Sequence, residues 1–381
     1  MNIPYGLVRE GLKKIYLILD YIFWLIFDFS KFKKIKKERI KKVLLIHQGV
    51  VGELIVTTPV IKALKDNFNC DISYMVNPGK EPLFINNPYI SEVLTFDENN
   101  FKKNLETIRS KNFDLTILFQ AHFKLAKMCW KAGIPYRIGG FSGFKRSPSI
   151  FFTRRFFPIV RKNTVLKNLE LAEIVGAKNI NPKIEVFSSK NDDLKIKKFL
   201  RKNKIEEFII VHPGFGDWEK KNANYRLWPV KKYSEFINSI IKNSKFKVIL
   251  GIGKISEKPL TSRILEHVWF KNKVIECSGL FDLAELISLI KHSKLVLAPD
   301  TGISHITSAL GIPLINLINS ENLKEWAPWG DSKKIININK HLGYQITFFP
   351  PKITFSEGIK SISVEEVLKA YNFLLKNEKK H

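Results

Sequence analysis

Residues 295–305 have the sequence LVLAPDTGISH, in which a short apolar run passes through a glycine turn into a segment of helical spacing. An apolar run of this length, rich in branched side chains, is typical of a parallel strand buried on both faces. The helical spacing continues to Leu310, where Gly311 ends it. The stretch therefore predicts a strand, a turn and a helix of an α/β fold.

The turn that begins this predicted helix suits an anion. The first N–H groups of a helix lack partners within it, and the helix dipole favours negative charge there. Gly302 would let a pyrophosphate approach the backbone, and Thr301 and Ser304 would add hydroxyl donors. Asp300 would cap the helix or hold the loop, and His305 follows one turn later. An ordinary capped turn with no ligand has the same spacing, and a lone histidine is more often an interior residue, so spacing alone leaves both alternatives open.

The same alternation of apolar runs and helical segments occurs twice along the chain, which predicts two doubly wound parallel sheets. The apolar runs that we interpret as strands are 43–46, 71–76, 93–96 and 114–119 in the first half, and 208–211, 247–250, 295–298 and 314–317 in the second. A polar stretch at 188–193 separates the halves. We therefore expect a segment of residues 1–40, a domain of 41–190 and a domain of 191–381. Two such sheets facing each other across a cleft form the GT-B architecture.

The second half places further polar groups after its strands, at the sheet edge where open α/β folds bind ligands. Gly214 lies in a glycine-bearing loop after the strand of 208–211, and Arg226 follows in the same connection. A guanidinium group can bind a phosphate through two parallel hydrogen bonds. Glu257 follows the next strand and could accept a hydrogen bond from a ribose or a base, or it could be a solvated residue at a helix start.

The composition indicates an anionic partner. The chain has 63 Lys and Arg against 36 Asp and Glu, a formal net charge of +27. A lysine-rich proteome is the alternative source of this excess. Basic and aromatic residues alternate over 144–162, and the arginines Arg146, Arg154 and Arg155 among them suit the anionic sugars and phosphates of a glycolipid. No nucleic-acid-binding motif accompanies them, so we do not expect a nucleic acid partner.

The first forty residues combine an apolar run at 15–27 with lysines on both sides. The run is shorter than the roughly 20 residues that cross a bilayer, and no signal-peptide cleavage site follows it. We interpret it as an amphipathic helix at an anionic membrane surface; docking on the protein itself is the alternative. Three cysteines without a paired motif indicate a reducing compartment. The expected location is cytoplasmic, peripheral at the inner face of the cytoplasmic membrane.

Several segments in order resemble glycosyltransferase family 9, the bacterial lipopolysaccharide heptosyltransferases. They are 298–313 (APDTGISHITSALGIP), the opening strand, turn and helix of 43–64 with its Thr57-Thr58-Pro59, the basic-x-Trp-Pro motif of 225–229 (YRLWP), the segment 325–330 (EWAPWG) and the closing helix of 362–375. The resemblance covers residues 42–375 and is weakest in the acceptor region. It implies an inverting transfer of a sugar from a nucleotide-heptose, usually ADP-heptose, to a nascent core oligosaccharide. It also implies that residues 301–305 bind the donor diphosphate and that Arg226 helps to neutralise it.

An inverting transfer needs a general base for the attacking hydroxyl and positive charge on the leaving diphosphate. The family position for the base is an Asp after Gly, and here Glu53 follows Gly52, which keeps the carboxylate. His47 replaces an early cation of the family and is the second candidate for the base. The chain has no Asp-x-Asp, so we expect neither a metal site nor a cofactor. Another nucleotide-sugar as donor, or a binding protein without catalysis, are the alternatives.

Overall fold

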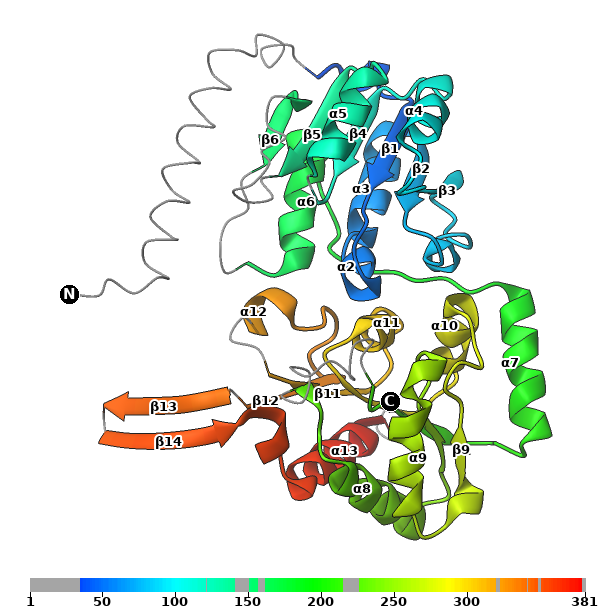
Figure 1. Cartoon of the computed structure of the whole chain (residues 1–381), viewed down its shortest axis with the longest axis vertical. Coiled ribbons are helices and arrows are strands. Elements are labelled where there is room, and N and C mark those ends of the chain that lie inside the picture. Colours follow the sequence, from blue (N-terminus) through cyan, green and yellow to red (C-terminus); the bar gives the residue numbers. More distant parts are fainter. Residues whose placement is uncertain are drawn as a thin grey trace. The chain divides into compact units, whose positions relative to one another are not determined.

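The computed structural model describes residues 35–120, 122–140, 151–156, 162–214, 226–319, 323–340, 342–348 and 351–378. The chain divides into two compact units, shown in Figure 1. The first is Met1–Val50 with Thr57–Pro182, and the second is Val51–Val56 with Lys183–His381. Three predictions lie outside the described residues: the N-terminal segment up to residue 34, Arg146, and the role of the Arg155 side chain.

The first unit is built on a six-stranded parallel sheet in the order β3-β2-β1-β4-β5-β6. Its strands are β1 (Lys42–Ile46), β2 (Asp71–Val76), β3 (Glu92–Thr95), β4 (Leu115–Leu118), β5 (Tyr136–Gly140) and β6 (Arg154–Phe156). Its helices are α3 (Thr58–Phe68), α4 (Phe101–Ser110), α5 (Phe123–Lys131) and α6 (Thr164–Ile174), with the short 3-10 turns η2 (Lys37–Arg39) and η3 (Glu81–Leu83). α3 packs against α6, and α4 packs against α5.

The second unit has a six-stranded parallel sheet in the order β12-β11-β10-β7-β8-β9 and a separate antiparallel hairpin. Its strands are β7 (Phe208–Val211), β8 (Lys247–Leu250), β9 (Val274–Glu276), β10 (Val296–Pro299), β11 (Leu314–Ile318), β12 (Ile335–Asn339), β13 (Leu342–Phe348) and β14 (Pro351–Glu357). Its helices are α2 (Val51–Ile55), α7 (Lys190–Lys202), α8 (Val230–Asn243), α9 (Lys258–Glu266), α10 (Leu283–Lys291), α11 (Gly302–Ala309), α12 (Leu323–Trp326) and α13 (Val364–Glu378), with 3-10 turns η6 (Ile255–Glu257), η7 (Lys271–Lys273) and η8 (Gly358–Ser361).

In each sheet the strand that comes first in the sequence, β1 or β7, lies in the middle, and later strands are added on both sides of it. In the second unit β7 lies between β8, which follows it in sequence, and β10, which comes much later. The connections after β7 and β10 therefore leave the sheet side by side and in opposite directions. Such a switch point is where open parallel sheets bind ligands. The connection after β10 is the Asp300 turn, and the connection after β7 begins with His212 and Gly214.

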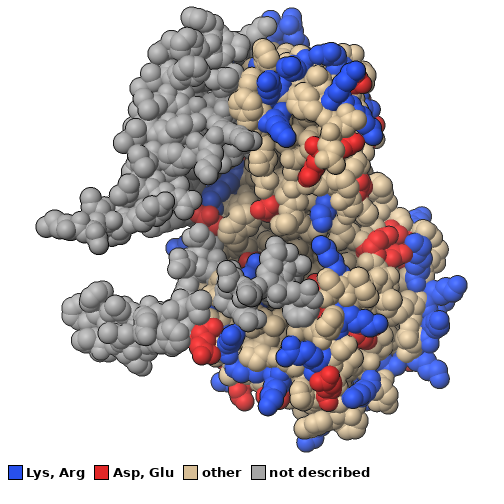
Figure 2. All heavy atoms as spheres, in the orientation of Figure 1, with Lys and Arg blue, Asp and Glu red and all other residues tan. Residues whose placement is uncertain are grey.

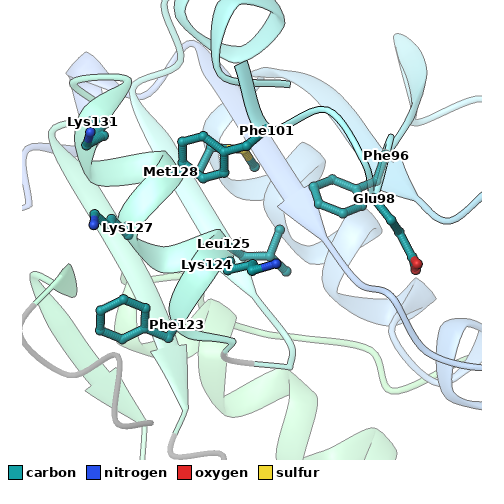
Figure 3. Close-up of a pocket in the computed structure, with 9 residues that line it drawn as sticks. All are labelled: Phe96, Glu98, Phe101, Phe123, Lys124, Leu125, Lys127, Met128 and Lys131. Carbon is teal, nitrogen blue, oxygen red and sulfur yellow. The ribbon is translucent and has the colours of Figure 1, made fainter. Parts of the chain in front are cut away.

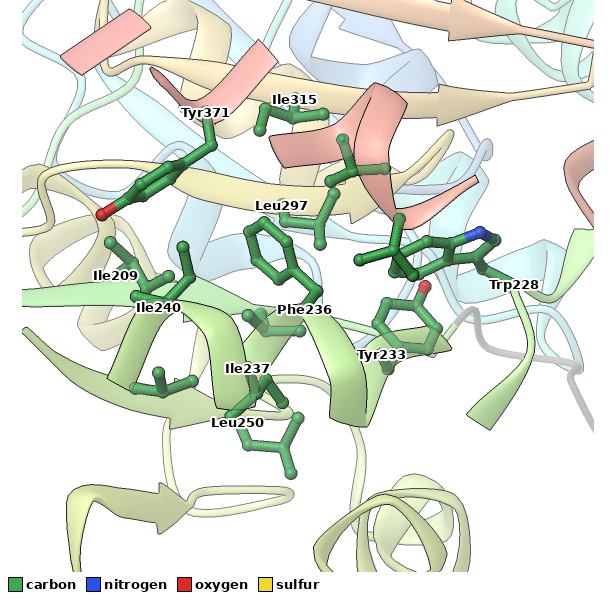
Figure 4. Packing of buried hydrophobic residues seen from close by; sticks show 14 of the residues in the cluster. Ile209, Trp228, Tyr233, Phe236, Ile237, Ile240, Leu250, Leu297, Ile315 and Tyr371 are labelled. Carbon is green, nitrogen blue, oxygen red and sulfur yellow. The ribbon is translucent and has the colours of Figure 1, made fainter. Parts of the chain in front are cut away.

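The core of the second unit joins the sheet to its C-terminal helix. Trp228 is fully buried, and its indole N–H donates to the Ile362 carbonyl at 2.9 Å. Phe236 of α8 meets Tyr371 of α13 edge to face, with ring centroids 6.0 Å apart. Figure 4 shows these rings with Leu297 of β10 and Ile315 of β11. Trp228, two residues after Arg226 in the sequence, thereby anchors this part of the chain in the core.

All eight predicted strands are confirmed, with ends that differ by one residue at most. The helical pattern of 53–68 is two helices, α2 and α3, and Pro59 stands in the first turn of α3, as its missing N–H allows. The sequence analysis missed β5, β6, β9, β12 and the hairpin. β6 and β9 have only three residues each, and β12 is only half-buried. The longer part of the second unit runs from Lys183 to His381, and its shorter part, Val51–Val56, lies within the range that the sequence analysis assigned to the first domain.

The positive charge extends over both units. Figure 2 shows Lys and Arg side chains spread over the visible face of the described residues, with Asp and Glu among them. Within the described part of the chain, no helix has the length and apolar character needed to span a bilayer.

Candidate functional site

The first turn of α11 is the predicted anion site, and its local geometry differs from the expectation in one respect. Thr301, in an extended conformation (φ −145°, ψ 175°), is the N-cap, and no side chain caps the helix. Asp300 is therefore not the cap; its own N–H donates to the Leu317 carbonyl at 3.1 Å. The hydroxyl oxygen of Thr301 is buried and has no hydrogen-bond partner among the described residues. The helix thus begins with an unsatisfied hydroxyl beside its free N–H groups.

Arg226 lies at this turn. Its Nη2 donates to the backbone carbonyl of Asp300 at 2.6 Å. Burial raises the pKa of the Asp300 carboxyl, and the Arg226 charge opposes that rise. A guanidinium held at the start of α11 adds to the positive end of the helix dipole. The structure therefore brings together Arg226 and the Asp300–Thr301 turn, which the sequence places 74 residues apart.

The Ser304 hydroxyl has a structural role, which corrects its assignment as a donor to the diphosphate. The side chain is fully buried and lies 2.8 Å from the Pro299 carbonyl and 3.0 Å from Oδ1 of Asn316. Asn316 in turn donates to Asn337 at 2.8 Å. This chain of hydrogen bonds ties α11 to β10, β11 and β12. The sequence analysis missed Asn316, although a polar residue inside an apolar strand is a visible signal.

The short helix α2 packs directly on α11, within the second unit. A Cβ on Gly52 would lie 2.7 Å from Cδ2 of His305, and a Cβ on Gly302 would lie 2.6 Å from Cγ1 of Val51. Gly302 is therefore needed for contact with α2, and its role beside a pyrophosphate stays a prediction. Glu53 follows Gly52 in the first turn of α2 and is half-buried. The two glycines bring the Glu53 segment against the start of α11.

Two buried histidines of the predicted site are neutral. Burial lowers the pKa of His305 to about 4, and its Nδ1 has no protein partner among the described residues. Burial and the charge of His122 lower the pKa of His47 to about 4. The Gly49 N–H donates to Nδ1 of His47 at 2.8 Å. That hydrogen bond occupies the lone pair that a general base would use, so the geometry disfavours His47 in that role.

Glu257 is buried beside two glycines at the carboxyl ends of β7 and β8. A Cβ on Gly214 or on Gly253 would lie 2.3 Å from its carboxyl group. Within the described part of the chain its Oε2 has no hydrogen-bond partner, and it is 3.7 Å from Nδ1 of His212. Burial raises the pKa of Glu257 to about 7, against the opposing effects of the Lys254 backbone N–H and charge. The alternative of a solvated residue is therefore wrong, since Glu257 is 2% exposed. The His212 contact was not foreseen from the sequence.

Of the predicted acceptor residues, only Arg154 has a described side chain. It lies on the edge strand β6, half-buried, and its Nη1 donates to the Thr153 carbonyl at 2.9 Å. Among the described residues, no group of three or more His, Cys, Asp and Glu side chains is arranged to hold a metal ion.

The model of glycosyltransferase family 9 (heptosyltransferase) matches residues 102–348. The chain belongs to this family. Lipopolysaccharide heptosyltransferase 3 of Escherichia coli K12 is 22% identical over 295 residues, which cover 74% of this chain and 83% of the relative. ADP-heptose lipopolysaccharide heptosyltransferase II of E. coli superimposes with a TM-score of 0.72 at 20% identity, covering 88% of this chain and 99% of the other. The E. coli heptosyltransferase WaaC with ADP gives a TM-score of 0.67 at 16% identity, covering 87% and 99%.

Membership of family 9 makes this chain a glycosyltransferase, and the solved structures show that its fold is GT-B. The family model includes α11, Arg226 and Glu257 but begins after α2. The assignment of Glu53 therefore depends on the packing of α2 against α11.

Proposed function

We propose that this family 9 glycosyltransferase transfers a heptose, with inversion, from a nucleotide-heptose to a lipopolysaccharide core or a related surface glycolipid. The names of its relatives support this choice, since they are lipopolysaccharide heptosyltransferases. ADP-heptose is the donor we favour because solved relatives are described with ADP and with an ADP-heptose analogue. The observation that carries the proposal is the packing of α2, which holds Glu53, on the first turn of α11.

The donor diphosphate would lie at the start of α11. The free N–H groups of the first turn and the unpartnered Thr301 hydroxyl would donate to its oxygens. Arg226, fixed to the Asp300 carbonyl, would balance the charge of the departing group. Neutral His305 would keep α2 in place and present its unpartnered Nδ1. Glu257, at the adjacent switch point, would accept a hydrogen bond from the nucleoside.

Glu53 would act as the general base. The acceptor hydroxyl gives its proton to the Glu53 carboxylate while its oxygen bonds to the anomeric carbon. The bond from that carbon to the phosphate oxygen breaks on the opposite face, so the configuration inverts. The nucleoside diphosphate leaves with the electron pair, and Arg226 with the α11 terminus stabilises the negative charge. Charge separation at the bond being broken makes this electrostatic stabilisation the larger contribution.

The substitution Glu53→Gln tests this mechanism. It removes the base but keeps size and hydrogen bonding, so kcat should fall about 10²- to 10⁴-fold, the usual contribution of general base catalysis. The dissociation constant for the nucleotide-sugar should change less than threefold, as measured by calorimetry. Glu235→Gln, an exposed carboxylate on α8, is the matched control and should leave both quantities unchanged. Transfer at the wild-type rate by the Glu53→Gln enzyme would exclude Glu53 as the base.

A thermal-shift panel of ADP-, GDP- and UDP-sugars tests the donor. A ligand that binds only the native state raises the free energy of unfolding by mass action, by about 2.7 kcal/mol at a hundred times its dissociation constant, and so raises the melting temperature. ADP-heptose should give the largest shift, and Arg226→Ala should remove most of it. A larger shift with a GDP- or UDP-sugar would mean that the same fold serves another surface glycan.

We also propose that the enzyme works at the inner, cytoplasmic face of the membrane, where its anionic glycolipid acceptor is found. The net charge of +27 and the basic strand β6 with Arg154 support an anionic acceptor. Arg154→Glu should therefore raise KM for a truncated lipopolysaccharide more than KM for the donor.

A further inference from the structure

The first unit contains a pocket that no part of the proposed reaction uses. Its cavity measures about 310 Å³, and it lies where the chain leaves β3, at the start of α4 and along α5. The lining side chains, shown in Figure 3, are Phe96, Glu98, Phe101, Phe123, Lys124, Leu125, Lys127, Met128 and Lys131. The volume is at the small end of ligand pockets, which suits a hydrocarbon segment better than a nucleotide-sugar.

The pocket wall is apolar. Phe96, Leu125 and Met128 are buried side chains of the unit's core, and Phe101 is 37% exposed at the rim. Among the described residues that line the pocket there is no Ser, Thr, Asn or Gln, so a sugar ring would find few hydrogen-bond partners. Met128 adds a flexible, polarisable surface that adapts to a chain of methylene groups. The wall therefore favours a hydrocarbon ligand.

Three lysines of α5 line the pocket, and in Figure 3 the Lys124 side chain points the other way from those of Lys127 and Lys131. Lys124, Lys127 and Lys131 are spaced to lie on one face of α5, and in Figure 3 Glu98 is on the other side of the cavity from Lys127 and Lys131. Within the described residues, no acidic side chain forms an ion pair with any of the three. Lys124 stands in the first turn of α5, where the helix dipole disfavours a cation. An anion bound beside these lysines would offset that repulsion.

The outer face of α5 continues with aromatic side chains. Trp130 is 50% exposed and lies 5.6 Å from the ring of Phe151, which lies 5.3 Å from the ring of Phe123. The Lys127 ammonium is 6.0 Å from the Phe123 ring centroid. Exposed aromatic rings with long basic side chains are typical of protein surfaces at the headgroup level of a bilayer. The pocket thus opens among groups suited to a lipid surface.

We propose that this pocket binds one acyl chain of a phosphate-bearing membrane lipid, with the chain against the apolar wall and the phosphate at the three lysines. The hydrocarbon wall and the row of cations are matched to the two ends of such a lipid. The site is separate from sugar transfer, because none of its residues has a role in the donor site or in catalysis. It would hold the first unit at the membrane independently of the N-terminal segment.

Calorimetric titration of the full-length protein with dodecyl phosphate, kept below its micellar concentration, tests the proposal. Saturable binding is expected. Lys127→Glu/Lys131→Glu should weaken it at least about tenfold, since each cation near an anionic lipid contributes about 1 kcal/mol. Phe101→Glu should weaken it similarly by placing a carboxylate at the mouth of the pocket. Phe101 is partly exposed, so this variant should melt at the wild-type temperature.

The matched control is Lys197→Glu/Lys198→Glu on α7, where a surface groove is lined by Leu194 and four cations but no aromatic ring. This control should bind dodecyl phosphate within twofold of the wild type. Equal loss in the control would mean general attraction to a basic surface and would overturn the proposal. Unchanged binding by a folded Phe101→Glu variant would also overturn it, since that result removes the hydrocarbon chain from the site.

Discussion

The side chain of Glu257 is buried, and its Oε2 accepts no hydrogen bond from the residues that the structure describes. His212 is neutral because burial lowers its pKa to about 4, so it cannot serve as a cation for Glu257. The buried hydroxyl of Tyr233 on α8 also lacks a hydrogen-bond partner among the described residues. Burial raises the pKa of Tyr233, and the charge of Glu257 adds to that rise. Buried polar groups without partners cost stability, and they are found where a ligand completes the hydrogen bonding.

The raised pKa of Glu257 predicts how stability depends on pH. The folded-state pKa of about 7 lies above the ordinary value of 4.5, so the folded protein binds this proton more tightly than the unfolded chain does. The stabilising contribution is complete below pH 4.5 and is lost as the pH rises through 7. Glu257→Gln should therefore raise the melting temperature relative to the wild type by about 2–4 °C at pH 8. Calorimetric scans should show no such gain at pH 5.

The exposed Glu235→Gln variant is the control and should melt as the wild type does at both values of pH. An equal effect of Glu257→Gln at pH 5 and pH 8 would contradict the raised pKa, because an uncharged packing effect does not depend on the proton.

At the scale of elements, the contact of α2 with α11 depends on two small residues. Gly52 meets the His305 ring, and Gly302 meets Val51. Close approach of two helices through glycine leaves no room for a methyl group, because side chains in such contacts are packed at crystal density. The direction of Glu53 from α2 is set by this contact.

The double-mutant cycle of Gly52→Ala and His305→Ala measures the contact. Alanine normally stabilises a helix by up to about 1 kcal/mol relative to glycine. In the wild-type background Gly52→Ala should instead destabilise the protein by about 1–3 kcal/mol, as overpacking does. In the His305→Ala background the same change should be neutral or stabilising. Additive effects in urea unfolding would show that the two residues are not coupled.

Sequence patterns predicted the central strands and the turn at Asp300 because buried parallel strands and helix starts leave local signals. They could not assign Ser304, whose partners Pro299 and Asn316 are defined only when β10 and β11 pair. They explained the glycine at position 302 by a bound ligand, because the sequence alone does not show that Val51 occupies the space beside it. Glu257 was found by its place after β8, but its burial depends on Gly214 from another connection.

At the scale of the whole molecule, the described chain from Lys36 onward is tied into the first unit. The Lys36 N–H donates to the Tyr136 hydroxyl at 3.3 Å, and the Lys41 and Lys42 N–H groups donate to Asp114 at 2.9 and 2.8 Å. Ile40 is fully buried. A deletion that removes the basic apolar segment should therefore end at residue 34 and keep these bonds.

Deletion of residues 1–34 tests the membrane role of that segment. The shortened protein should bind ADP-heptose as the wild type does, and its affinity for vesicles of anionic phospholipid should fall at least about tenfold in flotation assays, because several lysines are lost. Neutral vesicles serve as the control. Undiminished vesicle binding would show that the segment is not the membrane contact.

The division of the chain has a consequence for building hybrids of family 9 enzymes. The polypeptide contributes Val51–Val56 to the second unit before it has completed the first. A chimera spliced at Pro182–Lys183 would thus pair one parent's α2 with the other parent's α11. A mismatch at Gly52 or His305 would then disturb the packing of Glu53, the proposed general base, against the first turn of α11. Exchange of donor specificity between relatives should succeed only when residues Val51–Val56 and the C-terminal half are taken from the same parent.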